Sequence, residues 1–133
     1  MRSNRDLARL LLRKAESDLA DVRRTLASDG PYDTALFHCQ QGVEKSLKAL
    51  LAAHDITYPK THDVAHLAEL CEELCPSLRQ LPFDLEEFNP FAVTIRYDDP
   101  DEPVSLTLAK EMFAKCNRVL AAVAAALPGG IGP

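Results

Sequence analysis

The stretch from Tyr32 to His54 constrains the fold more than any other part of the chain. At about 100° per residue on a helix, its larger apolar residues fall in one arc that can face a core. This arc holds Leu36, Cys39, Val43, Leu47, Leu50 and Leu51. A neighbouring arc, whose small residues let another helix approach closely, holds Ala35, Gly42, Ser46, Ala49 and Ala53. The stretch therefore predicts a long helix with two packed faces, which is typical of a helical bundle.

Polar residues on this helix occupy two kinds of position. A third arc, expected to face water, holds His38, Gln41, Glu44, Lys45 and Lys48. Gln40 instead lies inside the apolar arc, where an unpaired buried amide would cost about 1–3 kcal/mol. We therefore expect a polar network that reaches this helix from elsewhere in the chain. Asp18 lies in the apolar arc of the preceding helix, and it either joins such a network or leans to water at the helix rim.

Helical periodicity continues through the chain, and no strand pattern competes with it. The expected helices run from about Ser3 or Asn4 to Ala27, from Asp33 to before Tyr58-Pro59, from Thr61 to before Pro76, over Leu81–Asp99 with an interruption at Pro90, and from about Val104 or Ser105 to Leu127. Asp33 and Thr61 are the expected caps of their helices. Because short loops favour antiparallel neighbours, we predict an all-α, up-and-down antiparallel bundle of four to five helices. It forms one domain over residues 3–127, and the tail 128–133 is expected to be disordered.

Composition and charge exclude several classes of protein. The chain has 133 residues and a net charge of −5, so it lacks the overall field that attracts DNA. Its apolar runs are far shorter than the ~20 residues that span a bilayer, and its start does not resemble a signal peptide. We therefore expect a cytoplasmic protein that binds neither membrane nor DNA. The four cysteines, Cys39, Cys71, Cys75 and Cys116, lie at apolar positions and are expected to be buried free thiols.

No complete catalytic or metal motif is present in the sequence. There is no glycine-rich phosphate loop and no serine with an evident neighbouring base. His62 and His66 have the spacing of metal ligands on a helix, and so do Cys71 and Cys75. The two pairs point to different sides of that helix, so they cannot converge on one ion. We expect no metal and no cofactor.

Arg96 and Tyr97 stand out because they close a helical segment directly before the acidic loop Asp-Asp-Pro-Asp-Glu-Pro. An arginine in this position can form paired hydrogen bonds to a carboxylate or a phosphate. The alternative is a surface ion pair with a neighbouring aspartate, worth about 0–1 kcal/mol. Polar residues on the first two helices favour the functional interpretation.

Four segments, in order along the chain, closely resemble the HEPN domain family. They are AESDLADV in the first helix, YDTALFHCQQGVEKSLKALL in the second, PKTHDVAHL before the third and IRYDDP near the fourth, and the resemblance covers roughly Asp6 to Leu127. It implies a helical bundle that forms homodimers and has a minimal nucleotidyltransferase as its partner. It also implies a role in binding nucleotides or RNA, and many such pairs act as toxin and antitoxin. Toxic members are metal-independent ribonucleases, whose signature is an arginine followed, after about four to six residues, by a histidine.

The departure from that signature decides our prediction. Arg96 matches the family arginine, but Asp101, Glu102 and Pro103 occupy the positions where the histidine should stand. We predict a noncatalytic, dimeric subunit that binds a nucleotide or a nucleotidyltransferase partner, in a module of the toxin–antitoxin type. Asp18 and Gln40 are expected to hold Arg96. The predicted ligand-binding residues are Arg96, Tyr97, Asp18, His38, Gln41, Lys45 and Lys48.

Two alternatives stay open at this point. One is a ribonuclease toxin in which His38 or His62 replaces the missing histidine and acts with Arg96 on RNA. The other is a structural dimer without a ligand, in which the polar residues only set the helix register and Gly42 lies at the contact between protomers.

Overall fold

The computed structural model describes residues 3–92 and 103–132. In these residues the chain forms four α-helices and two 3₁₀ helices, and no strand. They are α1 (Asn4–Leu26), α2 (Asp33–Ala53), α3 (Val64–Cys71), η1 (Pro76–Gln80), η2 (Leu85–Phe91) and α4 (Leu106–Ala126). The prediction of an all-α helical bundle is confirmed.

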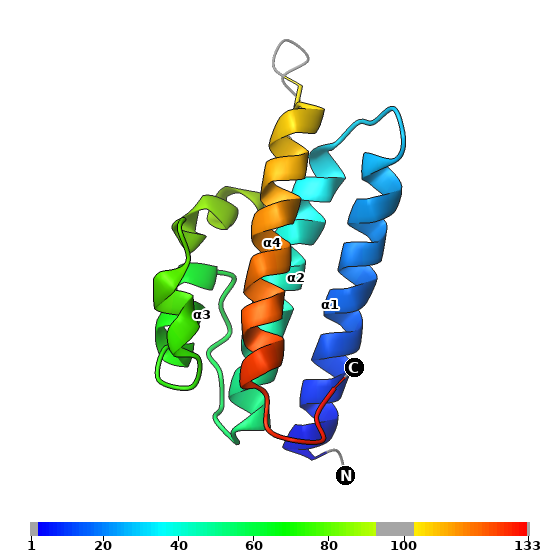
Figure 1. Cartoon of the computed structure of the whole chain (residues 1–133). Coiled ribbons are helices and arrows are strands. Elements are labelled where there is room, and N and C mark those ends of the chain that lie inside the picture. The colour runs from blue at the N-terminus through cyan, green and yellow to red at the C-terminus, as the bar shows by residue number, and fades with distance from the viewer. Residues whose placement is uncertain (1–2, 93–102, 133) are drawn as a thin grey trace.

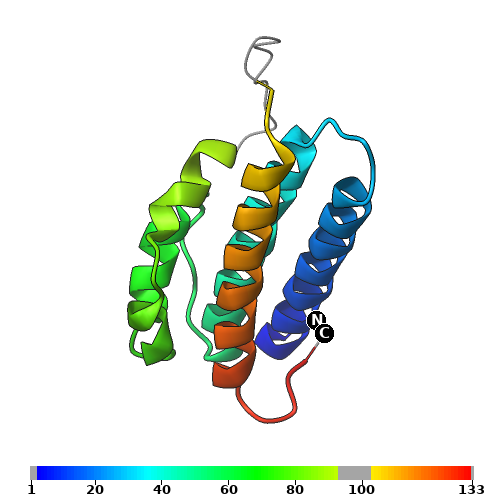
Figure 2. The same cartoon turned by 45° about the horizontal axis from the view of Figure 1, so that its top comes forward.

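Three long helices, α1, α2 and α4, lie side by side along the molecule (Figure 1). In both views α1 runs antiparallel to α2 and to α4, and α3 with the two 3₁₀ helices lies on the opposite side of α2 and α4 from α1 (Figures 1 and 2). Because α2 and α4 run in the same direction, the segment between them must carry the chain back along the bundle.

Two serines cap the terminal helices, where the sequence leaves the start open between Ser3 and Asn4 and between Val104 and Ser105. Ser3 caps α1 by accepting a hydrogen bond from the Asp6 N–H, and the Asp6 carboxylate accepts one from the Ser3 N–H in return. Ser105 caps α4 by accepting a bond from the Leu108 N–H. Each cap satisfies donors that the first turn of a helix cannot pair internally.

Both of the other expected caps are wrong. Asp33 is the first residue of α2 and makes no capping bond, since Tyr32 occupies the cap position. Asp63, and not Thr61, caps α3 by accepting from the His66 N–H. The hydroxyl of Thr61 accepts from the N–H of Asp63 and so supports the cap from one position further out.

The region that follows α3 is less regular than the sequence pattern suggests. The helix expected over residues 81–99 is represented by η2, and η1 precedes it without having been predicted. Pro90 lies inside η2. Leu85 and Phe88 are buried, and Phe83 and Phe91 pack against the core from its edge, as expected for residues that close one end of a bundle. The remainder of the predicted helix, residues 93–99, lies outside the described residues.

The centre of the core is the apolar arc of α2, and all six of its residues are buried. The arc of small residues beside it contacts α1. A Cβ added at Gly42 would lie only 2.8 Å from Leu19 Cδ1 of α1. The close helix approach predicted from the small residues therefore occurs inside one chain. This contradicts the alternative in which the face around Gly42 is the contact between protomers.

Several further expectations concern the surface and the ends of the chain. All four cysteines are buried and free, as predicted.

Residues 128–132 pack on α1, in contrast to the expected disorder. Ile131 is buried, and the guanidinium groups of Arg5 and Arg9 donate to the carbonyls of Gly129 and Gly130. None of the helices in the described ranges combines the length and hydrophobicity that a bilayer crossing requires.

Candidate functional site

Two buried carboxylates organise the polar face of α2. Asp18 comes from α1 and Glu44 from α2 itself, and each residue is only 5% exposed. A buried carboxylate is strongly unfavourable unless charged or polar groups surround it. The partners of Asp18 and Glu44 therefore define the site.

Asp18 holds a histidine and a lysine from α2. Its Oδ1 lies 2.8 Å from Nδ1 of His38, and its Oδ2 lies 2.6 Å from Nζ of Lys45. Since a carboxylate only accepts, Nδ1 of His38 is the donor in this hydrogen bond. Nε2 of the same ring lies 3.9 Å from Oδ2 of Asp21. A hydrogen bond from Arg24 lowers the pKa of the Asp21 carboxyl.

Glu44 repeats the same arrangement on the other side of the polar face. Its Oε1 accepts from Nε2 of Gln40 at 3.0 Å and from Nδ1 of His62 at 2.8 Å. Its Oε2 accepts from Nζ of Lys48 at 3.1 Å. Burial alone would raise the pKa of Glu44, but the hydrogen bonds from Gln40, His62 and Lys48 outweigh it and hold the pKa below its ordinary value. Glu44 is therefore an anion in the folded protein near neutral pH.

Gln40 is the buried amide that the helical pattern placed inside the core. It is fully buried, and besides its bond to Glu44 its Nε2 donates to the His62 carbonyl at 3.1 Å. Its Oε1 accepts from Nε2 of Gln41 at 2.7 Å. The expected polar network is confirmed, because it joins α2 to the chain segment that precedes α3.

Each buried carboxylate thus holds one lysine and one histidine, and the two lysines lie one helical turn apart on α2. The side chains of Lys45 and Lys48 are 23% and 13% exposed, so part of each reaches solvent. Lys48 also lies over the ring of Tyr58, 5.4 Å from its centroid. We name Asp18, His38, Lys45, Glu44, Lys48 and His62 the double clamp. An ammonium has three N–H donors, so each lysine keeps capacity for a further acceptor beyond its carboxylate.

Asp18, Asp21 and His38 lie close enough together to be considered as ligands of a metal ion. Ligand atoms of Asp18, Asp21 and His38 lie within 4.8 Å of one another. However, Lys45 already bonds Asp18 and Arg24 already bonds Asp21. These two cations would repel a divalent ion at the same carboxylates. The electrostatics of the double clamp favour an acceptor-rich ligand over a metal.

The structure gathers five of the predicted ligand-binding residues on one face: Asp18, His38, Gln41, Lys45 and Lys48. Arg96 and Tyr97 lie outside the described residues, so their part in the site stays a prediction. The same holds for the expectation that Asp18 and Gln40 hold Arg96, although both already bond the partners described above.

Sequence analysis missed two members of the double clamp. Glu44 was assigned to the arc that faces water, and His62 was considered as one of a pair of metal ligands or as a replacement for the missing catalytic histidine, but not as a partner of Glu44. A signal for Glu44 was present, because it stands four residues after Gln40 and four before Lys48, and residues with this spacing are neighbours on a helix. For His62 the local sequence carried no comparable signal.

Comparisons with known proteins agree with the fold. The family model of the HEPN domain matches residues 8–126. Among solved structures, the chain is similar to ST0689, an archaeal HEPN homologue, with a TM-score of 0.60 and 24% sequence identity. The likeness covers 94% of this chain and 98% of that one. No curated protein matches this sequence significantly.

Proposed function

Because the chain belongs to the HEPN domain family, we propose that it is a noncatalytic binding subunit whose double clamp receives a nucleotide or an RNA phosphate. In this proposal the protein is a homodimer and pairs with a minimal nucleotidyltransferase in a module of the toxin–antitoxin type. The observation that carries the binding role is the pair of lysines on α2, each tied to a buried carboxylate.

The geometry supports phosphate binding through preorganisation. A free surface lysine must give up rotamer freedom when it binds a ligand, at about 0.5–1.5 kcal/mol for each such side chain. Asp18 and Glu44 already fix Lys45 and Lys48, so this entropy is lost on folding and not on binding. Their remaining N–H donors can then meet phosphate oxygens, which are strong acceptors for charged donors.

The charge balance of the double clamp implies that an anionic ligand would be bound with modest strength. Each carboxylate compensates one lysine, so these four groups together carry little net charge. Arg96 is proposed to add a further cation from the neighbouring segment.

The noncatalytic part of the proposal rests on the sequence after Arg96. Asp101, Glu102 and Pro103 stand where a toxic family member would carry its histidine. A carboxylate there can accept a proton, but it would repel the charge that develops on phosphate during RNA cleavage.

Calorimetric titration with ATP, GTP and a short RNA tests the binding role. The informative variant is the double substitution Asp18→Asn/Lys45→Met, which removes a lysine without leaving its carboxylate charged and buried. It should abolish the binding heat, while the matched control Lys14→Met, on the exposed face of α1, should retain it. If no ligand gives heat with the parent protein and no nucleotidyltransferase is retained in a pull-down, the proposal is wrong.

One observation favours a second candidate function, a ribonuclease that uses an atypical base. The bond from Nδ1 of His38 to Asp18 orients the ring and leaves Nε2 outside this bond, which is how a carboxylate orients a general base. High expression should then arrest growth, and either His38→Asn or Arg96→Ala should relieve the arrest. Normal growth at high expression, together with intact RNA after incubation with the purified protein, would exclude this function.

A further inference from the structure

Residues 128–131 form a defined turn, which leads the chain from the end of α4 back to α1 (Figures 1 and 2). The N–H of Ile131 donates to the carbonyl of Pro128 at 3.2 Å and closes this turn. Gly130 has a φ of +85°, in the left-handed region that favours glycine. We name residues 128–131 the strap. Its turn places the side chain of Ile131 against α1 and α2.

The strap is held by one apolar side chain and two arginines. Arg5 and Arg9 of α1 donate to two of its carbonyls at 3.1 and 3.2 Å, and both bonds lie at the exposed surface. Ile131 is 8% exposed and belongs to an apolar cluster. The other buried members of this cluster are Ala8, Leu12, Ala49 and Ala52. Because exposed hydrogen bonds exchange with water at little net gain, burial of Ile131 supplies most of the energy that docks the strap.

This docking is weaker than the packing of the helices. Three of the four residues 129–132 are glycine, which loses more conformational freedom on ordering than any other residue. Burial of the single side chain of Ile131 must offset that loss. The strap should therefore open locally at a lower free energy than the helices do.

The same apolar cluster supports one lysine of the double clamp. Tyr58 packs against the cluster, and Nζ of Lys48 lies 5.4 Å from the centroid of the Tyr58 ring. Ala52 of the cluster stands four residues after Lys48, and residues with this spacing are neighbours on a helix surface. Only 13% of the Lys48 side chain is exposed. A chain of contacts thus joins Ile131, through the cluster, to Tyr58 and Lys48.

We propose that the strap positions Lys48 for the phosphate ligand of the double clamp, with Ile131 and Tyr58 as positioning residues. While Ile131 is docked, the cluster is filled and Tyr58 stays beside Lys48. When the strap opens, Tyr58 shifts into the vacated space and Glu44 alone restrains the lysine. The ligand must then order Lys48 on binding, so its affinity falls. This inference rests on the proposed function and deepens it, since a segment outside the double clamp regulates that site.

The test opens the strap of the full chain in two independent ways. Ile131→Ala removes the anchor, and Gly130→Val disfavours the turn because a β-branched residue rarely adopts a positive φ. The first readout is the rate at which an N-hydroxysuccinimide ester acylates Lys48 relative to Lys45, mapped by mass spectrometry. Both variants should raise this ratio severalfold, because an opened strap exposes only the first of these lysines.

The second readout is calorimetric titration with ATP, GTP and a short RNA. The affinity of the ligand that binds the parent protein should fall roughly two- to tenfold in both strap variants, as expected when one mobile side chain must be fixed. Ile131→Val keeps a branched apolar anchor and should restore most of the parent's behaviour in both readouts.

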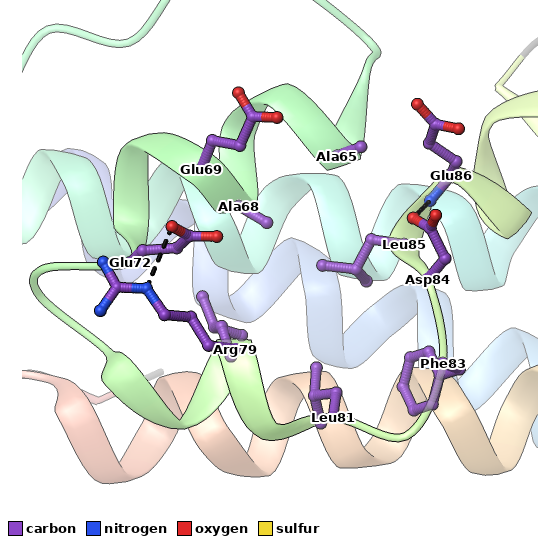
Figure 3. A pocket seen from close by; sticks show the side chains of 11 residues that line it. Ala65, Ala68, Glu69, Glu72, Arg79, Leu81, Phe83, Asp84, Leu85 and Glu86 are labelled. Carbon is purple, nitrogen blue, oxygen red and sulfur yellow. Dashed lines mark hydrogen bonds and ion pairs between the residues drawn. The ribbon is translucent and has the colours of Figure 1, made fainter.

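Two control variants separate the strap from a general loosening of the fold. Gly129→Val makes the same change one residue earlier, where a Cβ meets nothing within 4 Å and φ is not positive. Leu78→Ala removes a side chain that is 7% exposed, close to the 8% of Ile131. Leu78 lines the groove between α3 and residues 78–86, which lies across α2 and α4 from α1 (Figures 2 and 3). Neither control should change either readout.

Tyr58→Leu tests the path from the strap to the lysine. This substitution should by itself raise the acylation rate of Lys48. Ile131→Ala should then add little to that rate, because both changes act through the same ring.

Three results would each overturn the proposal. One is an unchanged acylation ratio in both Ile131→Ala and Gly130→Val. Another is an equal change in Leu78→Ala, which would mean general loosening. The third is undiminished ligand affinity in the two strap variants of a parent that binds. If the parent binds none of the ligands, the proposed function fails, and the acylation ratio still decides whether the strap positions Lys48.

Discussion

Replacement of Glu44 by glutamine is the sharpest test of the polar network. The substitution keeps the size of the side chain but removes the charge and one of its two acceptor oxygens. Three donors, from Gln40, His62 and Lys48, then compete for the one remaining oxygen. The side chain of His62 is 66% exposed and can turn to water, so its loss is small.

The expected loss in the free energy of unfolding depends on the two remaining donors, Gln40 and Lys48. Gln40 is fully buried but keeps its second bond to the His62 carbonyl, and Lys48 loses a partly buried ion pair. A lost hydrogen bond to a charged group in such surroundings is worth about 1.5–3 kcal/mol. We expect Glu44→Gln to lower the free energy of unfolding at pH 7 by about 2 kcal/mol, measured by urea denaturation.

The lowered pKa of Glu44 determines the direction in which its contribution to stability changes with pH. The pKa of Glu44 is lower in the folded chain than its ordinary value of 4.5. Its contribution to stability is therefore fully present above pH 4.5 and is lost as the pH falls through the folded pKa. The parent protein and Glu44→Gln should converge in stability once the pH falls below the folded pKa of Glu44. A difference that stays constant from pH 7 to the acid range would refute the assignment of Glu44 as a buried anion held by these donors.

Three further predictions concern packing and reactivity. Gly42→Leu should destabilise the single chain by about 3 kcal/mol or more, because even a Cβ would lie 2.8 Å from Leu19 Cδ1; Gly129→Leu, where a Cβ meets nothing within 4 Å, should change urea unfolding little. Burial raises the pKa of Cys71 to about 12, so a thiol reagent at neutral pH should leave Cys71 unmodified until urea unfolds the chain, as modification mapped by mass spectrometry would show. Ile131→Ala should cost about 2 kcal/mol in thermal or urea unfolding, whereas a tail that did not pack would show no change.

The sequence predicts the polar network from Gln40 but not all of its members. Gln40 could be assigned because a polar residue within an apolar arc is visible from helical spacing alone. Glu44 lies at the edge of that arc, and its burial depends on the segment that brings His62 against α2. Contacts between segments distant in sequence leave no periodic signal, so the position of His62 could not be predicted from local pattern.

The cap of α3 shows the same limit on a smaller scale. Thr61 and Asp63 are both residues that favour a cap position, and nothing in the local sequence chooses between them. In the folded chain Asp63 also accepts from Nδ2 of Asn89 at 2.9 Å, and Asn89 in turn accepts from the Val64 N–H. The choice is made by η2, which lies 25 residues or more away along the chain. Asp18 was left undecided for a similar reason, since its burial depends on His38 and Lys45 of the next helix.

The packing of residues 128–132 on α1 brings the two ends of the described chain together (Figures 1 and 2). A short linker could therefore join these ends, and new ends could be opened in the connection Ala27–Tyr32 between α1 and α2. In such a circular permutant α1 would be synthesised last and would dock onto a preformed α2 face. Its folding would reveal whether the remaining helices can assemble before the carboxylate of Asp18 reaches its lysine and histidine.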